Sequence, residues 1–146
     1  MKNILLVLLM VIFLFSCKKD DGPNNNNSYL TAPPTNISLN LNLPQYNALN
    51  FDGATVVLSS SGVGGIVVYR QSESQIFAYD LADPNHVPIS CSSMTVDGLV
   101  ASCPCPDDEN SYAISLFGLH QGDQNANQPM LPYRTDKNGN VITITN

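Results

Sequence analysis

The stretch of residues 91–112, "CSSMTVDGLVASCPCPDDENSY", contains the features on which the fold and the site both depend. Two short runs, 91–96 and 99–103, flank Asp97 and Gly98, and such a dipeptide between apolar runs is a strong signal for a β-hairpin. The second run ends in Cys103 and Cys105, which enclose a proline, and acidic residues follow. The sequence therefore predicts a hairpin that ends in two thiols, which could hold a metal, form a disulfide or do neither.

The rest of the chain from residue 36 onward also reads as strands. In "NISLNLNLP" (36–44) every second residue is Ile or Leu, which is the period of a half-buried strand. Further strands are predicted at 54–58, 65–70, 75–80, 111–117, 131–135 and 141–145. No ten residues in this part show helical periodicity. Short, regularly spaced strands indicate an all-β sandwich or small barrel of antiparallel sheets.

Composition limits the classes of function. The chain has 146 residues, enough for one domain, and 43% of them are hydrophobic. Its net charge is -6, and beyond residue 36 the basic side chains are Arg70, Arg134 and Lys137, which argues against binding nucleic acid. No Ser/His/Asp or Cys/His grouping is close in sequence, and no glycine-rich phosphate loop is present. We therefore expect a protein that is not an enzyme.

Residues 1–16 resemble a bacterial lipoprotein signal peptide. One Lys precedes an unbroken apolar run, 4–15, that is shorter than the roughly 20 residues a membrane-spanning helix needs. "LFSC" (14–17) resembles a lipobox, which implies cleavage before Cys17 and acylation of its thiol. The alternatives are an ordinary signal peptide or a short anchor. The lipoprotein reading predicts a domain attached to a membrane by its acyl chains.

Residues 17–35 predict a disordered tether, because they are rich in Asn, Pro and charge without apolar periodicity. "KKDD" (18–21) resembles the export signal of surface lipoproteins in the Bacteroidetes. That resemblance implies an outer-membrane protein exposed at the cell surface, whereas the plain alternative is a solvated linker. The folded domain is then expected over 36–146.

The order of motifs in that domain resembles the Rieske domain, specifically the lipoprotein-borne Rieske-like proteins of the Bacteroidetes. The resemblance runs from about Leu39 to Asn146, on "GIVVYR" (65–70), "IFAYD" (76–80), "DGLVASCPC" (97–105), "LPYRT" (131–135) and "NGNVITI" (138–144). It implies three stacked antiparallel sheets. Two loops would project from the small central sheet and clasp a [2Fe–2S] cluster.

A Rieske cluster takes two thiolates on one iron and two imidazoles on the other. The family supplies them as Cys-x-His in the first loop and Cys-x-x-His in the second. In this chain the first pair of positions holds Asp83 and Asn85, with His86 one residue too late. The second pair holds Cys103, which is kept, and Pro106, which has no donor atom. One of the four ligands remains.

Other departures point the same way. Asp107, Asp108 and Glu109 follow the second loop, where they would repel an anionic cluster, and Gly122 lacks the proline that usually adjoins it in the covering loop. We expect a domain that has lost its cofactor and acts as a binding or structural module for envelope proteins or glycan. The alternative is electron transfer through an atypical [2Fe–2S] cluster.

A single metal ion is a further alternative. Asp83, His86, Cys103 and Cys105 could surround a zinc ion, since mixed carboxylate, imidazole and thiolate sites bind zinc. Such a site would require both loops to be rebuilt. His120 is expected to be an ordinary loop histidine, and the acidic run is expected to be a solvated turn.

The cysteines also predict a disulfide, because exported proteins occupy compartments where disulfides persist. With Cys17 acylated, three cysteines remain. A two-residue turn at 97–98 would place Cys91 opposite Pro104, so that Cys103 and Cys105 are both diagonal neighbours and either pairing is open. In the Rieske family a disulfide often uses the second cysteine of Cys-Pro-Cys. The resemblance therefore implies Cys91–Cys105, with Cys103 left over.

Overall fold

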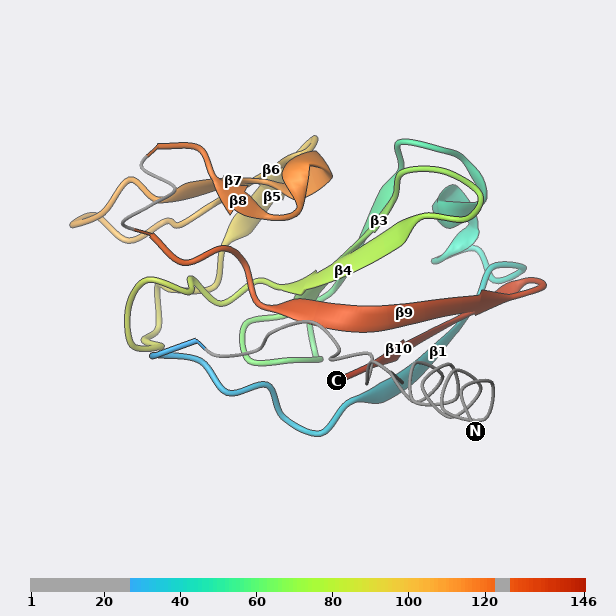
Figure 1. The fold of residues 1–146 in the computed structure, drawn as a ribbon, viewed down its shortest axis with the longest axis horizontal. Helices are drawn as coiled ribbons and strands as arrows, with labels where there is room; N and C mark the ends of the chain where they lie inside the picture. The colour runs from blue at the N-terminus through green and yellow to red at the C-terminus, as the bar shows by residue number, and fades with distance from the viewer. Residues whose placement is uncertain (1–26, 123–126) are drawn as a thin grey trace, which may run out of the picture.

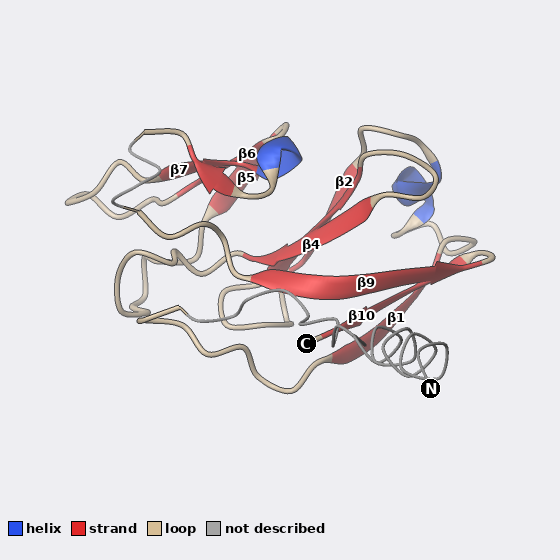
Figure 2. Ribbon diagram, in the orientation of Figure 1, coloured by secondary structure: helices blue, strands red, loops and turns tan. Residues whose placement is uncertain are grey.

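The computed structural model describes residues 27–122 and 127–146, and its regular structure is almost entirely β (Figures 1 and 2). The strands are β1 (Asn36–Asn40), β2 (Thr55–Leu58), β3 (Ile66–Arg70), β4 (Ile76–Asp80), β5 (Thr95–Asp97), β6 (Val100–Ser102), β7 (Ser111–Ala113), β8 (Leu119–His120), β9 (Pro132–Asn138) and β10 (Val141–Thr145). Two short 3-10 turns are η2 (Asn47–Asn50) and η3 (Ile114–Leu116). The expected all-β class of antiparallel sheets is confirmed.

The strands form two antiparallel sheets. The larger has the order β1-β10-β9-β4-β3-β2 and the smaller the order β5-β6-β7-β8. Strand β9 joins what would otherwise be two sheets, because its residues 134–138 pair with β10 while 132–133 pair with β4. The three separate sheets that the resemblance implies are therefore two hydrogen-bonded sheets in the described residues.

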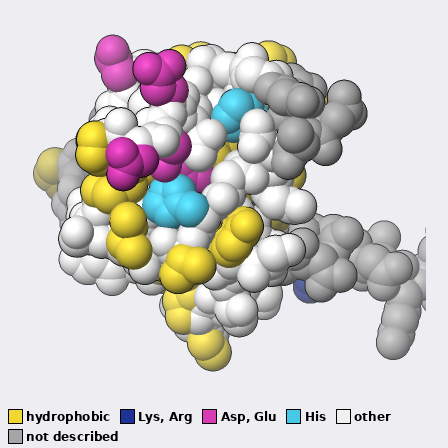
Figure 3. Space-filling model, turned by 90° about the vertical axis from the view of Figure 1, so that its left-hand side faces the viewer, with side chains coloured by type: hydrophobic (Ala, Val, Ile, Leu, Met, Phe, Trp, Pro, Cys, Tyr) yellow, Lys and Arg dark blue, Asp and Glu magenta, His cyan; other side chains and the backbone are white. Residues whose placement is uncertain are grey.

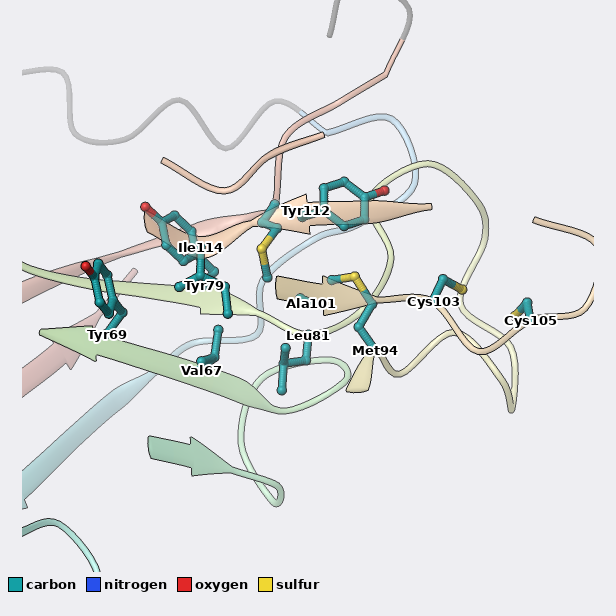
Figure 4. Close-up of a cluster of buried hydrophobic side chains, with 11 residues drawn as sticks. Val67, Tyr69, Tyr79, Leu81, Met94, Ala101, Cys103, Cys105, Tyr112 and Ile114 are labelled. Carbon is teal, nitrogen blue, oxygen red and sulfur yellow. The ribbon is translucent and has the colours of Figure 1, made fainter. Parts of the chain in front are cut away.

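The β3–β4 hairpin is the middle layer of the domain. All five residues of β3 are buried, so both faces of this strand are covered by protein. Val67, Tyr69 and Tyr79 face a core shared with the small sheet, which Figure 4 shows, whereas Val68 and Ala78 belong to a second core. That second core is shared with β1 and β10. Burial on both faces explains why this stretch reads as a continuous apolar run rather than as an alternating one.

The hairpin of β5 and β6 forms with a register that differs from the expected one. Asp97 pairs with Val100, so the two turn residues are Gly98 and Leu99 rather than Asp97 and Gly98. Gly98 has a φ of 57°, and a two-residue turn with a positive φ at its first central position favours glycine there. Gly98 meets this requirement in the observed register.

Two expected strands are shorter than their sequence patterns. Regular pairing in 91–97 begins only at Thr95, because the residues before it pair with the chain just after β4. Ser93 bridges to Ala82, and the Met94 N–H donates to the Leu81 carbonyl. The strand expected over 111–117 ends at Ala113, where the chain turns through η3 into Phe117, with a φ of 58°, and Gly118. The sequence pattern gave no sign of β8 or η2.

Part of the expected tether belongs to the folded domain. Leu30 is 2% exposed and packs with Ala82 and Leu131, and the side chain of Asn27 donates a hydrogen bond to the carbonyl of Pro84. The apolar side chain of Leu30 gains burial there, so residues 27–35 do not behave as the free linker that their composition suggested. The signal peptide, Cys17 and the rest of the tether lie outside the described residues. No helix in the described part is long and apolar enough to cross a membrane.

The buried carboxylate of Asp80, at the end of β4, fixes the start of the first loop. It accepts hydrogen bonds from the backbone N–H groups of Val63, Gly64 and Ala82 and from the hydroxyl of Tyr133, at 2.7–2.9 Å. Four donors satisfy both oxygens, so this buried charge is stabilised where it lies. The Gly-rich segment 59–65 and the first loop thereby share one anchor.

Replacing Asp80 by Asn should lower the free energy of unfolding by about 1–3 kcal/mol, because an amide NH₂ would face N–H donors and leave them unsatisfied. The matched control is Asp52→Asn, since Asp52 pairs with Arg70 at 2.9 Å but its side chain is 60% exposed. Urea unfolding of both variants measures the difference. Equal losses in the two variants would contradict the role assigned to Asp80.

Candidate functional site

Two loops meet at one end of the molecule, on the left of Figure 1. The first, 81–94, follows β4, and the second, 103–110, connects β6 to β7. A disulfide between Cys91 and Cys105 joins them, with Cα atoms 5.1 Å apart, and Cys103 is a free, buried thiol. The first loop is also closed on itself by a bridge between Ala82 and Ser93. The backbone of both loops is thus held in place at the site.

Asp83 is the centre of a buried hydrogen-bond network. It is 0% exposed, and its Oδ1 accepts hydrogen bonds from the Tyr112 hydroxyl at 2.7 Å and from the Asn85 N–H at 2.9 Å. Its Oδ2 accepts a third, from the side chain of Asn110 at 3.0 Å. Asp83 and Asn85 lie in the first loop, Asn110 in the second and Tyr112 in β7. The carboxylate therefore connects the two loops to the small sheet.

Asn85 extends this network toward residue 128. Its side-chain amide donates to the Tyr112 hydroxyl at 2.8 Å and to the carbonyl of Gln128 at 3.0 Å. Its side-chain oxygen accepts the N–H of Gln128 at 2.7 Å. Every polar atom of this side chain is thus engaged with protein. Asn85 bridges the first loop to the segment that leads into β9.

His120 is part of the same network, although its sequence suggested an ordinary loop residue. It lies in β8, is 9% exposed, and packs edge-on against the ring of Tyr112. Its Nδ1 accepts the N–H of Gly122 at 2.9 Å, so the neutral ring carries its proton on Nε2 and donates to the Asn110 side-chain oxygen at 3.1 Å. This contact orients the Asn110 amide so that it donates to Asp83.

A second cluster lies beside Asp83, around the imidazole of His86. The Nε2 atom of His86 is 3.5 Å from the Cys103 sulfur, 3.3 Å from Asp108 Oδ2 and 3.7 Å from Asp83 Oδ2. The Cys105 sulfur is 3.9 Å from the same atom, but it belongs to the disulfide and offers no thiolate. The fold thus brings together Asp83, His86 and Cys103, as the zinc alternative required, while the disulfide removes Cys105 from the donor set.

The environment sets the charge of these groups. Burial raises the pKa of the Cys103 thiol to about 12, a backbone hydrogen bond from Cys105 opposes this, and the carboxylates of Asp108 and Asp83 add to the rise. Burial also acts to raise the pKa of Asp83, but the hydrogen bonds from Tyr112, Asn85 and Asn110 outweigh it and hold that pKa below its usual value. At neutral pH the site therefore holds a carboxylate and a neutral thiol.

Residues that sequence reasoning missed are Asn110, Tyr112 and Gln128. Tyr112 reaches the site because β7 pairs with β6 in a register that sets Tyr112 opposite Ala101. Asn110 follows from the same register, and Gln128 is brought in by a contact that spans 43 residues of sequence. No local pattern could have indicated these long-range placements.

The surface over the two loops is open and of mixed character. Figure 3 shows acidic, histidine and apolar side chains gathered on this face. Val87 and Ile89, at the tip of the first loop, are 62% and 59% exposed. They rim a shallow pocket lined by His86, Val87, Ile89, Cys91, Cys105, Pro106, Asp107 and Asp108. Pro106 therefore lies at the surface, beside the buried network.

Comparison with known proteins adds little. No protein-family model and no curated protein matches this sequence. One solved structure that matches is a chain of the complex of reduced oxygenase and oxidized ferredoxin in carbazole 1,9a-dioxygenase, with a TM-score of 0.42 and 19% identity. The match covers 67% of the present chain and 86% of that chain. A likeness of this size carries no argument about what the present chain binds.

In the presence of EDTA, Cys103 should react with iodoacetamide at about pH 8 at least about 100-fold more slowly in the native protein than in urea, because only the thiolate reacts. Because the pKa of Cys103 is raised in the fold, the free energy of unfolding also depends on pH. The contribution of the neutral Cys103 thiol is complete below the ordinary pKa of 9.0 and is lost as the pH rises from 9.0 to about 12. Peptide mapping after timed alkylation measures the rate. Equal rates in the two states would show that the thiol is exposed or ionised.

Proposed function

We propose that this chain is a lipid-anchored protein of the bacterial outer membrane whose Rieske-like β domain works without a [2Fe–2S] cluster, as a non-catalytic binding or structural module. The observation that supports this most directly is the engagement of Asp83 and Asn85. These residues stand at the first-loop positions where the family has its ligands, and here their side chains hold the loops together by hydrogen bonds.

The Rieske-like character is supported by the order of hairpins and loops. The β3–β4 hairpin leads into the first loop, and the β5–β6 hairpin leads into the second. Both loops lie at one end of the small sheet and are joined by Cys91–Cys105, the pairing that the sequence resemblance implied. In this arrangement the two loops can hold a bound group between them.

The donor set argues against a cluster in that place. Two irons need four strong ligands, and thiolates are the usual ones. Among the positions that the family uses, only Cys103 offers a sulfur or nitrogen donor of that kind. Asp83 offers only carboxylate oxygens, which hold iron–sulfur clusters poorly, and Pro106 has no donor atom. The residues at the family's ligand positions therefore do not fit a [2Fe–2S] cluster.

A binding role is supported by the loop surface. Exposed apolar side chains of Val87 and Ile89 lie next to the acidic Asp107 and Asp108 over the two loops. Such a mixture suits contact with another envelope protein or with glycan. The anchor would keep this end of the domain within reach of its partner at the membrane surface. We propose neither binding of nucleic acid nor catalysis.

Electron transfer is the second candidate, because one observation favours it: His86 and Cys103 converge within 3.5 Å between the loops. An atypical cluster could use these two donors. It would still lack a third and a fourth ligand of suitable type, since the Cys105 sulfur is held in the disulfide. The first candidate is therefore preferred.

Protein produced in cells that assemble iron–sulfur proteins should be colourless, without stoichiometric iron and without a spin-resonance signal after reduction. The matched positive control rebuilds the missing ligands with Asp83→Cys, Asn85→His and Pro106→His together, under the same conditions. Uptake of a cluster by the rebuilt chain alone would support loss of donors as the cause. A stoichiometric [2Fe–2S] signal in the unaltered protein would favour the electron-transfer candidate instead.

Replacing Cys17 by Ser should abolish incorporation of a radiolabelled fatty acid and leave the chain unprocessed, because the acyl chains attach to that thiol. The control is Cys103→Ser, which removes the free thiol of the domain and should leave labelling intact. Labelling in the bacterial host, followed by electrophoresis, measures both. Undiminished labelling of Cys17→Ser would rule out the anchor.

A further inference from the structure

We propose that the two loops hold a single zinc ion on His86, Cys103 and Asp108, with Asp83 closing the fourth side. This proposal goes beyond the function proposed above and does not depend on it. His86 and Asp108 occupy none of the positions that the family uses for a cluster, so the site is new to this chain. The first observation is geometric: the ligand atoms of His86, Cys103 and Asp108 lie within 4.8 Å of one another.

The distances from His86 Nε2 to its neighbours match those in a tetrahedral zinc site. Bonds of about 2.3 Å to sulfur and about 2.0–2.1 Å to nitrogen or oxygen, at tetrahedral angles, place neighbouring ligand atoms roughly 3.3–3.6 Å apart. The His86 Nε2 atom is 3.5 Å from the Cys103 sulfur and 3.3 Å from Asp108 Oδ2. Asp83 Oδ2 lies at 3.7 Å, only slightly beyond this range. The imidazole is therefore placed where it could share a zinc ion with these neighbours.

The imidazole of His86 is already oriented as a ligand. Its Nδ1 lies 2.9 Å from the carbonyl oxygen of Val87, and because a carbonyl only accepts, Nδ1 carries the proton. In the neutral ring the lone pair is then on Nε2, the atom that faces the sulfur and the two carboxylates. Zinc-bound histidines commonly donate their other N–H to a carbonyl or carboxylate in this way.

Charge also favours a cation. The carboxylates of Asp83 and Asp108 lie 3.7 and 3.3 Å from His86 Nε2, and within the described residues neither forms an ion pair with any other side chain. The three Lys and Arg residues of the domain are Arg70, Arg134 and Lys137, and none lines the loop pocket. A divalent cation would neutralise this concentration of negative charge in a partly dehydrated place.

The two loops are already arranged as such a site requires. The disulfide Cys91–Cys105 fixes the second loop next to the first, and Asp83 is held by hydrogen bonds to Tyr112 and Asn110. Side chains of His86 and Asp108 are 23% and 25% exposed, which leaves a path for the ion from solvent. On binding, the Cys103 thiol gives its proton to solvent as the zinc–sulfur bond forms. With four protein ligands the zinc would be structural and would link the two loops.

The test uses full-length protein purified in detergent, stripped with a chelator, and titrated with Zn²⁺ against a coloured chelator. One zinc per chain is expected, and Co²⁺ should give the thiolate-to-cobalt charge-transfer band and the visible bands of a tetrahedral ion. His86→Gln, Asp108→Asn and Cys103→Ser should each weaken zinc binding by more than about 100-fold, since even loss of a supporting group costs 10–100-fold. Near-UV circular dichroism verifies that each variant is folded.

Asp107→Asn is the matched control, because Asp107 is the exposed neighbour of Asp108 and its substitution removes the same charge. It should change zinc affinity by no more than about threefold. The proposal fails if zinc does not bind stoichiometrically, if Co²⁺ binds without the charge-transfer band, or if Asp107→Asn weakens binding as much as Asp108→Asn. Iron is measured in the same samples. Stoichiometric iron would contradict the cluster-free function, whereas a lack of stoichiometric zinc would contradict only the zinc site.

Discussion

The buried carboxylate of Asp83 is the constraint on which the loop end of the molecule depends. A charge that is 0% exposed persists only where donors compensate the lost water, and Tyr112, Asn85 and Asn110 supply three. Asn85 lies in the same loop as Asp83, whereas Asn110 lies at the end of the second loop and Tyr112 in β7. Satisfying one carboxylate therefore fixes both loops and the small sheet relative to one another.

This network and the disulfide together hold the two loops in one arrangement. Cys91–Cys105 links the loops covalently, while Asn85 links the first loop to Gln128 ahead of β9. Hydrogen bonds of this kind are individually modest, but a buried network with all members satisfied specifies one arrangement. Within the described residues no buried side-chain nitrogen or oxygen lacks a partner. These contacts connect the two loops to each other and to the segment before β9.

The same architecture brings potential metal donors together. His86 lies two residues from Pro84 and is turned by its contact with the Val87 carbonyl, so its Nε2 faces Cys103 and Asp108. The middle layer, β3 and β4, is buried on both faces and carries the first loop from Asp80, whose four hydrogen bonds hold that starting point. A rigid layer under mixed polar loops is the usual way in which a fold presents a site.

The sequence by itself determined the all-β class, most strand positions and the two loops, because strand alternation, β-branched runs and turn glycines are local properties that neighbouring residues reveal. It also singled out Asp83, Asn85 and Cys103. Tertiary structure alone decided the register at Gly98, the packing of Leu30 on the domain, and the roles of Tyr112, Asn110 and His120. The physical reason is that these depend on strand pairing and on contacts between residues far apart in the chain, which no local pattern encodes.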